Sequence, residues 1–145
     1  MHIVTDLLRT KGHQVYTITP NATVFEALEL MAARDIGALV VLDENGELAG
    51  IFSERDHARK VDLLGRSARE VRVGEIMSAP VICVTPGDTV EACMNLMTNH
   101  RIRHLPVREK DQLLGLISIG DVVKAIITKQ QFLIDQLENY ITGQR

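Results

Sequence analysis

The stretch that decides the fold occurs twice in the chain. The segments IGALVV (residues 36–41) and GIFSERD (50–56) return in the same order as IRHLPV (102–107) and GLISIGD (115–121). In each copy an apolar run is followed, after a polar turn, by a second apolar run that ends in Ser-x-x-Asp. Repetition at a fixed period indicates two similar structural units arranged in tandem.

Matches between the two copies extend upstream of these segments. From Val15 to Val41 each residue aligns with the residue 66 positions later, and after the loop the offset becomes 65. Upstream, Val4–Leu8 is similar to Val73–Met77. The identical pairs include Thr19 and Thr85, Pro20 and Pro86, Thr23 and Thr89, Met31 and Met97, Ser53 and Ser118, and Asp56 and Asp121.

Each copy predicts a β-α-β-β-α unit. The first strand ends at Thr-Pro, because proline favours a turn and removes a backbone donor. A helix capped by Thr23 or Thr89 follows, with apolar residues at helical spacing. Two strands and a second helix that opens with Ser-x-x-Asp complete the unit. The expected strands are Val15–Ile18, Gly37–Leu42 and Leu48–Phe52 in the first copy, and Val81–Val84, His104–Arg108 and Leu113–Ile117 in the second.

We expect an α+β fold in which the two repeats form a single module. A unit of about 60 residues is marginal alone, so two repeats that cover each other's sheets, related by a pseudo-two-fold axis, are better stabilised. The predicted boundaries are 1–62 for the first repeat with its N-terminal helix, 63–72 for a polar connector, 73–128 for the second repeat and 129–145 for a C-terminal helical extension.

The C-terminal helix is predicted from about Asp121 to Ile141. Its apolar residues lie at helical spacing and form one stripe. Since this helix continues beyond the repeat, its stripe requires a further surface, either a partner subunit or the module itself. The stripe contains Val123, Ile126, Ile127, Leu133, Ile134, Leu137 and Ile141.

Composition favours a folded globular protein and argues against two classes of partner. The 145 residues carry 16 Lys and Arg against 19 Asp and Glu, a net charge of −3, and 46% are hydrophobic. The longest apolar run, Ile36–Leu42, is far shorter than the roughly 20 residues of a membrane span. The acidic balance and the 3% aromatic content disfavour nucleic acid. With no signal-type N-terminus, we expect a cytoplasmic protein.

The sequence shows no catalytic or metal-binding pattern outside the repeats. Cys83 and Cys93 align with Thr17 and Ala27, so we interpret them as packing residues, like the core methionines Met31, Met94 and Met97. The five histidines lack metal spacing, and no glycine-rich phosphate loop is present. We therefore expect no enzymatic activity and no required cofactor.

The two Ser-x-x-Asp motifs have two interpretations. An ionised carboxylate in the first turn of a helix accepts hydrogen bonds from both hydroxyls of a ribose, and the free backbone N–H groups of that turn suit a phosphate. The same pattern is also a capping box, which stabilises a helix by about 1 kcal/mol. The two roles are compatible, and their occurrence at matched positions favours ligand binding.

Positive charge for a phosphate is available near both motifs. Arg101, Arg103 and His104 lie at a strand entry, and Arg55, Arg59 and Lys60 follow the first Ser-x-x-Asp. The alternatives are a solvated helix face for the second group and a structural histidine at His104.

The duplicated unit resembles a tandem pair of cystathionine-β-synthase-type (CBS) domains, a Bateman module, over roughly Val4 to Lys124. The segments ERDHARK (54–60) and RIRHLPV (101–107) are similar to those of stand-alone proteins with two CBS domains. Val40 departs from the family pattern, which prefers the proline found at Pro106.

The resemblance implies two clefts for adenine nucleotides (AMP, ADP, ATP, and in some members NAD(H) or S-adenosylmethionine). Each cleft would take Ser-x-x-Asp from one repeat and its adenine-binding strand largely from the other. One would use Ser118 and Asp121 with Gly12, Tyr16, Ile36, Gly37 and Ala38. The other would use Ser53, Arg55 and Asp56 with Ser78, Ile82, Ile102, Arg103 and His104.

The implied function is a regulatory sensor that signals energy or redox state to an unidentified protein through a homodimer. The two clefts differ, since Gly37-Ala38 aligns with Arg103-His104. We therefore expect unequal ligands or affinities. The alternative is a ligand-independent dimeric scaffold that recruits its partner through the C-terminal helix.

Overall fold

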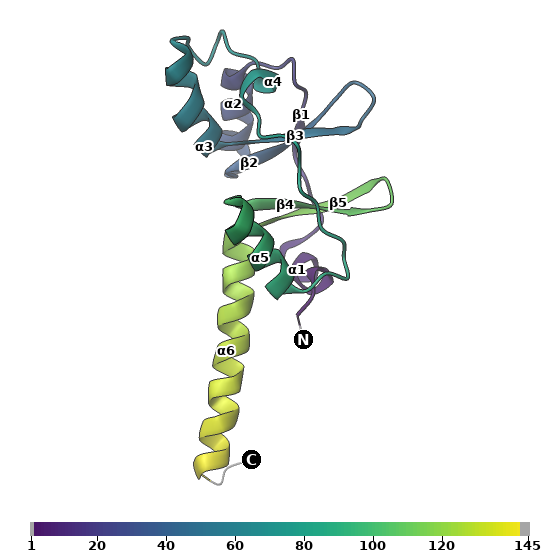
Figure 1. Cartoon of the computed structure of the whole chain (residues 1–145), viewed down its shortest axis with the longest axis vertical. Helices are drawn as coiled ribbons and strands as arrows, with labels where there is room; N and C mark the ends of the chain where they lie inside the picture. Colours follow the sequence, from purple (N-terminus) through teal and green to yellow (C-terminus); the bar gives the residue numbers. More distant parts are fainter. Residues whose placement is uncertain (1, 143–145) are drawn as a thin grey trace. The chain divides into compact units, whose positions relative to one another are not determined.

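The computed structural model describes residues 2–142, and its contacts divide the chain into two compact units. The repeat-one unit comprises residues 14–82. The repeat-two unit combines the N-terminal segment up to His13 with the chain from Cys83 onward. Figure 1 shows the elements of both units coloured along the sequence. Each unit mixes helices and strands, and the two repeats expected from the sequence are present.

The repeat-one unit contains a three-stranded sheet. Strand β1 (Thr17–Ile18) runs parallel to β2 (Ala38–Leu42), which pairs antiparallel with β3 (Leu48–Ser53). The other elements are helices α2 (Val24–Arg34), α3 (Glu54–Asp56) and α4 (Val73–Ile76), the π-helical turn η1 (His57–Val61) and the 3₁₀ turn η2 (Asp62–Leu64). Helix α2 begins where Thr23 Oγ accepts a hydrogen bond from Glu26 N at 3.1 Å, as its N-cap position predicts.

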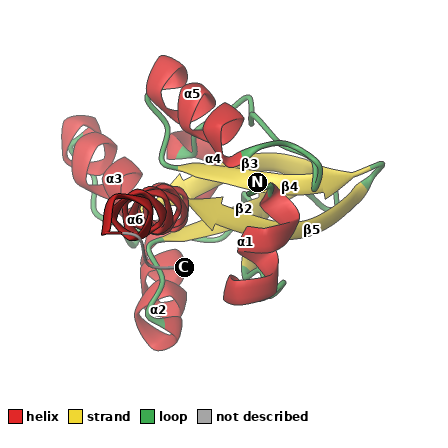
Figure 2. Ribbon diagram, turned by 90° about the horizontal axis from the view of Figure 1, so that it is seen from below, coloured by secondary structure: helices red, strands yellow, loops and turns green. Residues whose placement is uncertain are grey.

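The repeat-two unit pairs two strands and carries the longest helix. Strand β4 (His104–Glu109) is antiparallel to β5 (Gln112–Ser118). Helix α1 (Val4–Lys11) contacts β5, and helix α5 (Val90–His100) is capped by Thr89, whose Oγ accepts from Ala92 N at 3.0 Å. Helix α6 (Ile119–Thr142), which Figure 2 shows almost end-on, confirms the predicted long C-terminal helix.

The strand predicted at Val81–Val84 is wrong: only a bridge between Val84 and Val107 forms, although the aligned segment contributes β1 to its sheet. Proline explains the difference. In the repeat-one unit Val40 N donates to Tyr16 O at 3.2 Å, but the residue aligned with Val40 is Pro106, which has no N–H. The parallel pairing in the repeat-two unit is therefore limited to one position.

The short helix that docks on each repeat precedes the other repeat in the sequence. Helix α1 packs in the repeat-two unit and α4 in the repeat-one unit. A glycine of the sheet permits each approach: a Cβ on Gly115 would lie 2.6 Å from Leu8 Cδ2, and one on Gly50 would lie 2.6 Å from Met77 Sδ. The N-terminal helix, which the sequence boundaries group with the first repeat, thus completes the fold of the second.

The predicted connector is an integral part of the repeat-one unit. Val71 is fully buried in the core with Val24, Phe52 and Val73. Its carbonyl accepts from Val24 N at 2.8 Å, and the carbonyl of Ala68 accepts from Phe25 N at 3.0 Å. These bonds satisfy first-turn donors of α2 that have no partner within the helix.

The sulfur-containing residues lie largely where packing predicts. Met31, Met97 and Cys93 are buried, whereas Met94 and Cys83 are half-buried. Burial, together with the nearby charge of Asp88, raises the pKa of the Cys93 thiol to about 11. None of the helices between residues 2 and 142 combines the length and apolarity needed to cross a membrane.

Candidate functional site

The first Ser-x-x-Asp forms a closed capping box at the end of β3. Ser53 N and Ser53 Oγ both donate to Asp56 Oδ2, at 2.9 and 3.2 Å, and Asp56 N donates back to Ser53 Oγ at 3.4 Å. The box fixes the carboxylate in the first turn after the strand, where the helix dipole favours its negative charge.

The other oxygen of Asp56 is also engaged. Ser78 Oγ donates to Asp56 Oδ1 at 2.9 Å, and Lys60 Nζ lies 2.9 Å from the same oxygen. Lys60 additionally donates to Ile76 O at 2.9 Å, which ties it to the end of α4. With 6% of its surface exposed, Asp56 is nearly buried, and both of its oxygens have protein partners.

The second Ser-x-x-Asp repeats the box but has a different third partner. Ser118 N and Ser118 Oγ donate to Asp121 Oδ2 at 2.8 and 3.0 Å, and Asp121 N donates to Ser118 Oγ at 3.2 Å. Lys11 Nζ, at the end of α1, donates to the same Oδ2 at 2.7 Å. Within the described residues of the repeat-two unit, the hydrogen bonds to the Asp121 carboxylate all go to Oδ2, and Oδ1 accepts none.

Asp121 is half-buried, and its environment favours the ionised form. Partial burial opposes ionisation, but the hydrogen bonds and charge of Lys11, together with the hydrogen bonds from Ser118, outweigh it, so the pKa of Asp121 lies below its ordinary value. The carboxylate is therefore charged at neutral pH, as a strong acceptor for hydroxyl groups must be.

The position of Lys11 is fixed by contacts at the end of α1. Gly12, which has a φ of 99°, ends the helix with its N–H donating to Leu8 O at 2.7 Å. His13 Nδ1 lies 3.2 Å from Leu114 O of β5. Gly12 therefore lies beside the residue that contacts Asp121, in the same unit.

Backbone bonds join each box to the strand entry of its own repeat. Glu54 N donates to Gly37 O at 3.1 Å, and Ile119 N donates to Arg103 O at 2.8 Å. In the sheets, Ala38 pairs with Ser53 and His104 pairs with Ser118. The small Gly37-Ala38 segment is thus fixed at the first box and the basic Arg103-His104 segment at the second.

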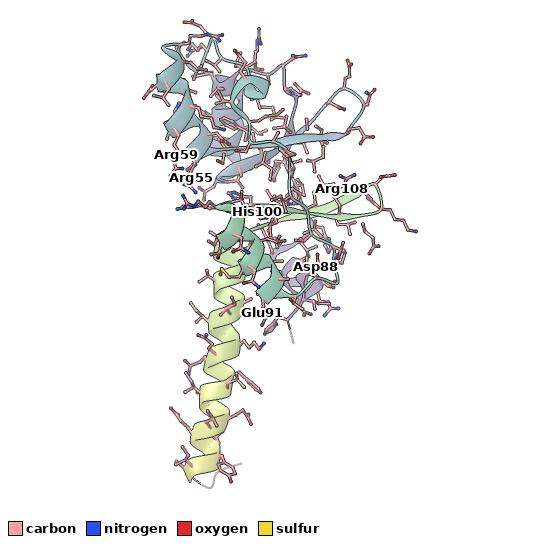
Figure 3. The ribbon with its side chains drawn as sticks, viewed as in Figure 1. Arg55, Arg59, Asp88, Glu91, His100 and Arg108 are labelled. Carbon is pink, nitrogen blue, oxygen red and sulfur yellow. The ribbon has the colours of Figure 1, made fainter. Side chains whose placement is uncertain are left out.

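The remaining residues predicted for the site lie outside the two capping boxes. Ile36, Ile82 and Ile102 are half-buried, and the guanidinium of Arg34 lies 5.1 Å from the centre of the Tyr16 ring. Arg55 and Arg59 extend from neighbouring turns of α3 and η1 (Figure 3). The two predicted clefts each combine residues of both units, so that grouping stays a prediction, as does a phosphate-binding role for the arginines.

Sequence reasoning named Lys60 only as positive charge for a phosphate and did not predict its contact with Asp56, and it missed Lys11 altogether. Lys60 carried a local signal, because it lies four residues after Asp56 in a helical segment. Lys11 carried none, since it lies 110 residues before Asp121 and reaches it only because α1 docks on the second repeat. Among residues 2–142, no cluster of His, Cys, Asp and Glu has the composition of a metal site.

Comparison with known proteins identifies both repeats. The family model for the CBS domain matches residues 4–56 and 73–128. A mitochondrial CBS domain-containing protein of Arabidopsis thaliana, CBSX3, is 38% identical over 148 residues, covering 97% of this chain and 72% of the relative.

Solved structures support the same assignment. A CBS-domain protein from Burkholderia ambifaria is 48% identical with a TM-score of 0.83, covering 88% of this chain and 96% of that one. The hexameric CBS-CP12 protein of bloom-forming cyanobacteria is 32% identical with a TM-score of 0.75, covering 85% and 70%. The resemblance drawn from the sequence is confirmed.

Proposed function

Because the chain belongs to the CBS-domain family, whose members are regulatory modules that commonly bind adenine nucleotides, we propose that it is a non-catalytic sensor of adenine nucleotides. Its ligands are AMP, ADP, ATP or NAD(H). It acts on a separate protein, as suits the stand-alone CBS-domain proteins among its relatives, which are typically regulatory.

The state of Asp121 carries this proposal. Its carboxylate is ionised, held by a capping box and close to a lysine, and its Oδ1 accepts no hydrogen bond from the described residues of its own unit. A ribose has two adjacent hydroxyls, and charge-assisted hydrogen bonds from them to a fixed carboxylate are strong. Lys11 and the first turn of α6 supply positive charge for the phosphate of the same ligand.

The box at Asp56 supports a second and weaker site. A ribose hydroxyl could bind its Oδ1 only by displacing Ser78 or Lys60. Binding there costs the hydrogen bonds that are lost, so we expect the Asp121 site to fill first. This order agrees with the inequality between the two clefts that the sequence predicts.

Signalling requires that the ligand bind one conformational or assembly state more tightly than another. We propose that this state is a homodimer, and the hexameric assembly of the cyanobacterial CBS-CP12 relative supports self-association. The alternative function is a dimeric scaffold that needs no ligand, and calorimetry separates the two.

The test is isothermal titration calorimetry of the full chain with AMP, ATP, NAD⁺ and NADH, and with Asp121→Ala and Asp56→Ala. A matched control is Asp88→Ala, because Asp88 also caps a backbone donor, Thr85 N at 2.8 Å, but lies outside both boxes. We expect binding to the wild type and the control, and a loss of affinity in Asp121→Ala. The absence of a binding signal with every nucleotide would support the scaffold function. Mass spectrometry of small molecules released from the purified protein identifies the ligand.

A further inference from the structure

Helix α6 exposes a long apolar surface in the repeat-two unit. Its early turns pack on α5 and α1, and Lys129 Nζ pairs with Glu91 Oε1 of α5 at 2.8 Å. Beyond this ion pair the helix continues alone to Thr142 (Figure 1). Val122 is buried, but eight other apolar residues of the helix are exposed, with exposed fractions from 39% at Val123 to 85% at Tyr140.

The spacing of this surface is that of a helix-pairing seam. Residues Val123, Ile127, Gln130, Ile134, Leu137 and Ile141 follow one another at alternating steps of four and three. This average period of 3.5 keeps one face of a helix against a second helix along its length. Leu133 and Tyr140 widen the seam on one side, whereas Phe132 lies on the opposite face of α6.

We propose that the seam binds α6 of a second copy of this chain in antiparallel orientation. When the two antiparallel helices cross with their Phe132 residues at the same level along the helix axis, Val123 faces Ile141 of the other copy and Ile127 faces its Leu137. Gln130 then faces Ile134, so every seam position meets another seam position. A single polar residue in such a seam favours one register over its alternatives.

The charges beside the seam select the antiparallel orientation. Lys124 lies near the start of the seam and Glu138 near its end, on the same flank. An antiparallel pair places Lys124 of each copy beside Glu138 of the other, which gives two complementary contacts. A parallel pair places this flank of each helix against the opposite, apolar flank of the other, so both contacts are lost. Charge complementarity of this kind is what sets partner choice and orientation in paired helices.

The exposed apolar area is large enough for a stable pair. The side chains on the seam and its apolar flank expose on the order of 700–800 Å² per chain, which approaches the roughly 800 Å² per partner of a standard stable interface. The members of this surface are Val123, Ile127, Leu133, Ile134, Leu137, Tyr140 and Ile141.

The test is sedimentation velocity of the full chain over a concentration series, with Leu137→Glu and Phe132→Glu. The two residues are matched, since each is 62% exposed, but only Leu137 lies in the seam. We expect a dimeric wild type, a dimer dissociation constant raised at least tenfold in Leu137→Glu, and a change of less than threefold in Phe132→Glu. Circular dichroism establishes that both variants keep their helix content.

A charge-exchange series tests the orientation. Lys124→Glu and Glu138→Lys each place like charges together in the antiparallel pair and weaken it, whereas the double variant restores the complementary contacts and the dimer. A monomeric wild type, equal effects of Leu137→Glu and Phe132→Glu, or a double variant weaker than either single one would overturn the proposal. This seam is the interface of the proposed homodimer, and its pairing does not require nucleotide. A lack of nucleotide binding in calorimetry would therefore leave the sedimentation test intact, and a monomer in sedimentation would leave the calorimetric test intact.

Discussion

The two Ser-x-x-Asp boxes share their internal hydrogen bonds and differ in what lies around them. In both, the serine N–H and hydroxyl donate to one carboxylate oxygen. Around Asp56 the second oxygen is taken by Ser78 and by Lys60 of the following turn. Around Asp121 the distant Lys11 shares the oxygen already bonded to the serine, and the other oxygen accepts no hydrogen bond from the described residues of the same unit.

This difference shows that a motif determines a local geometry but not the availability of its functional atom. The four residues of the box are sufficient to cap the helix and place the carboxylate. Whether that carboxylate can accept a ligand depends on the helix that docks next to it, which is α4 in one unit and α1 in the other. The copies can therefore have diverged in function without any change in the motif.

The largest expected effect is on nucleotide affinity. Replacing Asp121 by alanine removes the charged acceptor of the ribose hydroxyls, and hydrogen bonds to charged groups contribute about 1.5–3 kcal/mol. We expect at least a tenfold loss of affinity at the tighter site, measured by calorimetry. Asp56→Ala should change the affinity of that site by less than about threefold. A larger loss of affinity in Asp56→Ala than in Asp121→Ala would mean that Asp56, and not Asp121, is the main ribose acceptor.

Stability should respond in the opposite order. Asp56→Ala leaves Ser78 and Lys60 without their acceptor in a nearly buried position, at a cost of about 1–2 kcal/mol once the partial exposure of Lys60 is taken into account. Asp121→Ala should cost about 0.5–1 kcal/mol, since its carboxylate is half-exposed. Urea unfolding measures both, and a costlier Asp121 variant would contradict the burial argument.

The glycines beneath the docked helices provide a finer test. Gly50→Ala would place a Cβ 2.6 Å from Met77 Sδ and 3.0 Å from the backbone oxygen of Ser78. Ser78 is also the residue whose hydroxyl donates to Asp56. For Gly115→Ala the three nearest atoms all belong to the side chain of Leu8, whose terminal methyl adjusts more easily than a backbone carbonyl. We expect a loss of about 1–2 kcal/mol at Gly50 and a smaller loss at Gly115. Gly37→Ala, whose Cβ meets nothing within 4 Å, is the control.

The smallest expected effect is on the pH dependence of stability. The pKa of folded Asp121 lies below its ordinary value of 3.8, so the stabilisation from its ion pair is complete above that pH and is lost as the pH falls through the lower, folded value. Asp121→Asn should therefore lose less stability than the wild type on acidification, by about 0.5 kcal/mol.

The control for this measurement is Asp111→Asn. The side chain of Asp111 is fully exposed and lies 3.8 Å from Arg108, also in the repeat-two unit. Urea midpoints between about pH 2 and 6 should follow the wild type for this variant. If the urea midpoint of Asp121→Asn also changed with pH as that of the wild type does, the ion pair between Asp121 and Lys11 would contribute nothing to stability.

Sequence reasoning predicted what local chemistry determines. The threonine caps, the paired strands and the Ser-x-x-Asp helix starts follow from residues within a few positions of one another. It failed at Val81–Val84, where an apolar run suggested a strand although Pro106, in the neighbouring strand, cannot donate to it. The contact between Lys11 and Asp121 was beyond reach, because it depends on which repeat α1 docks against.

The proposed nucleotide sensing requires that the carboxylate of Asp121, in the repeat-two box, be the one available to a ligand. An amide NMR titration with AMP tests this most directly. Amides of Lys11, Gly12 and Ser118–Gly120 should shift at lower ligand concentration than those of Ser53–Arg55. Shifts that begin at Ser53–Arg55, or that bypass both boxes, would contradict the assignment of Asp121 as the primary ligand-binding carboxylate.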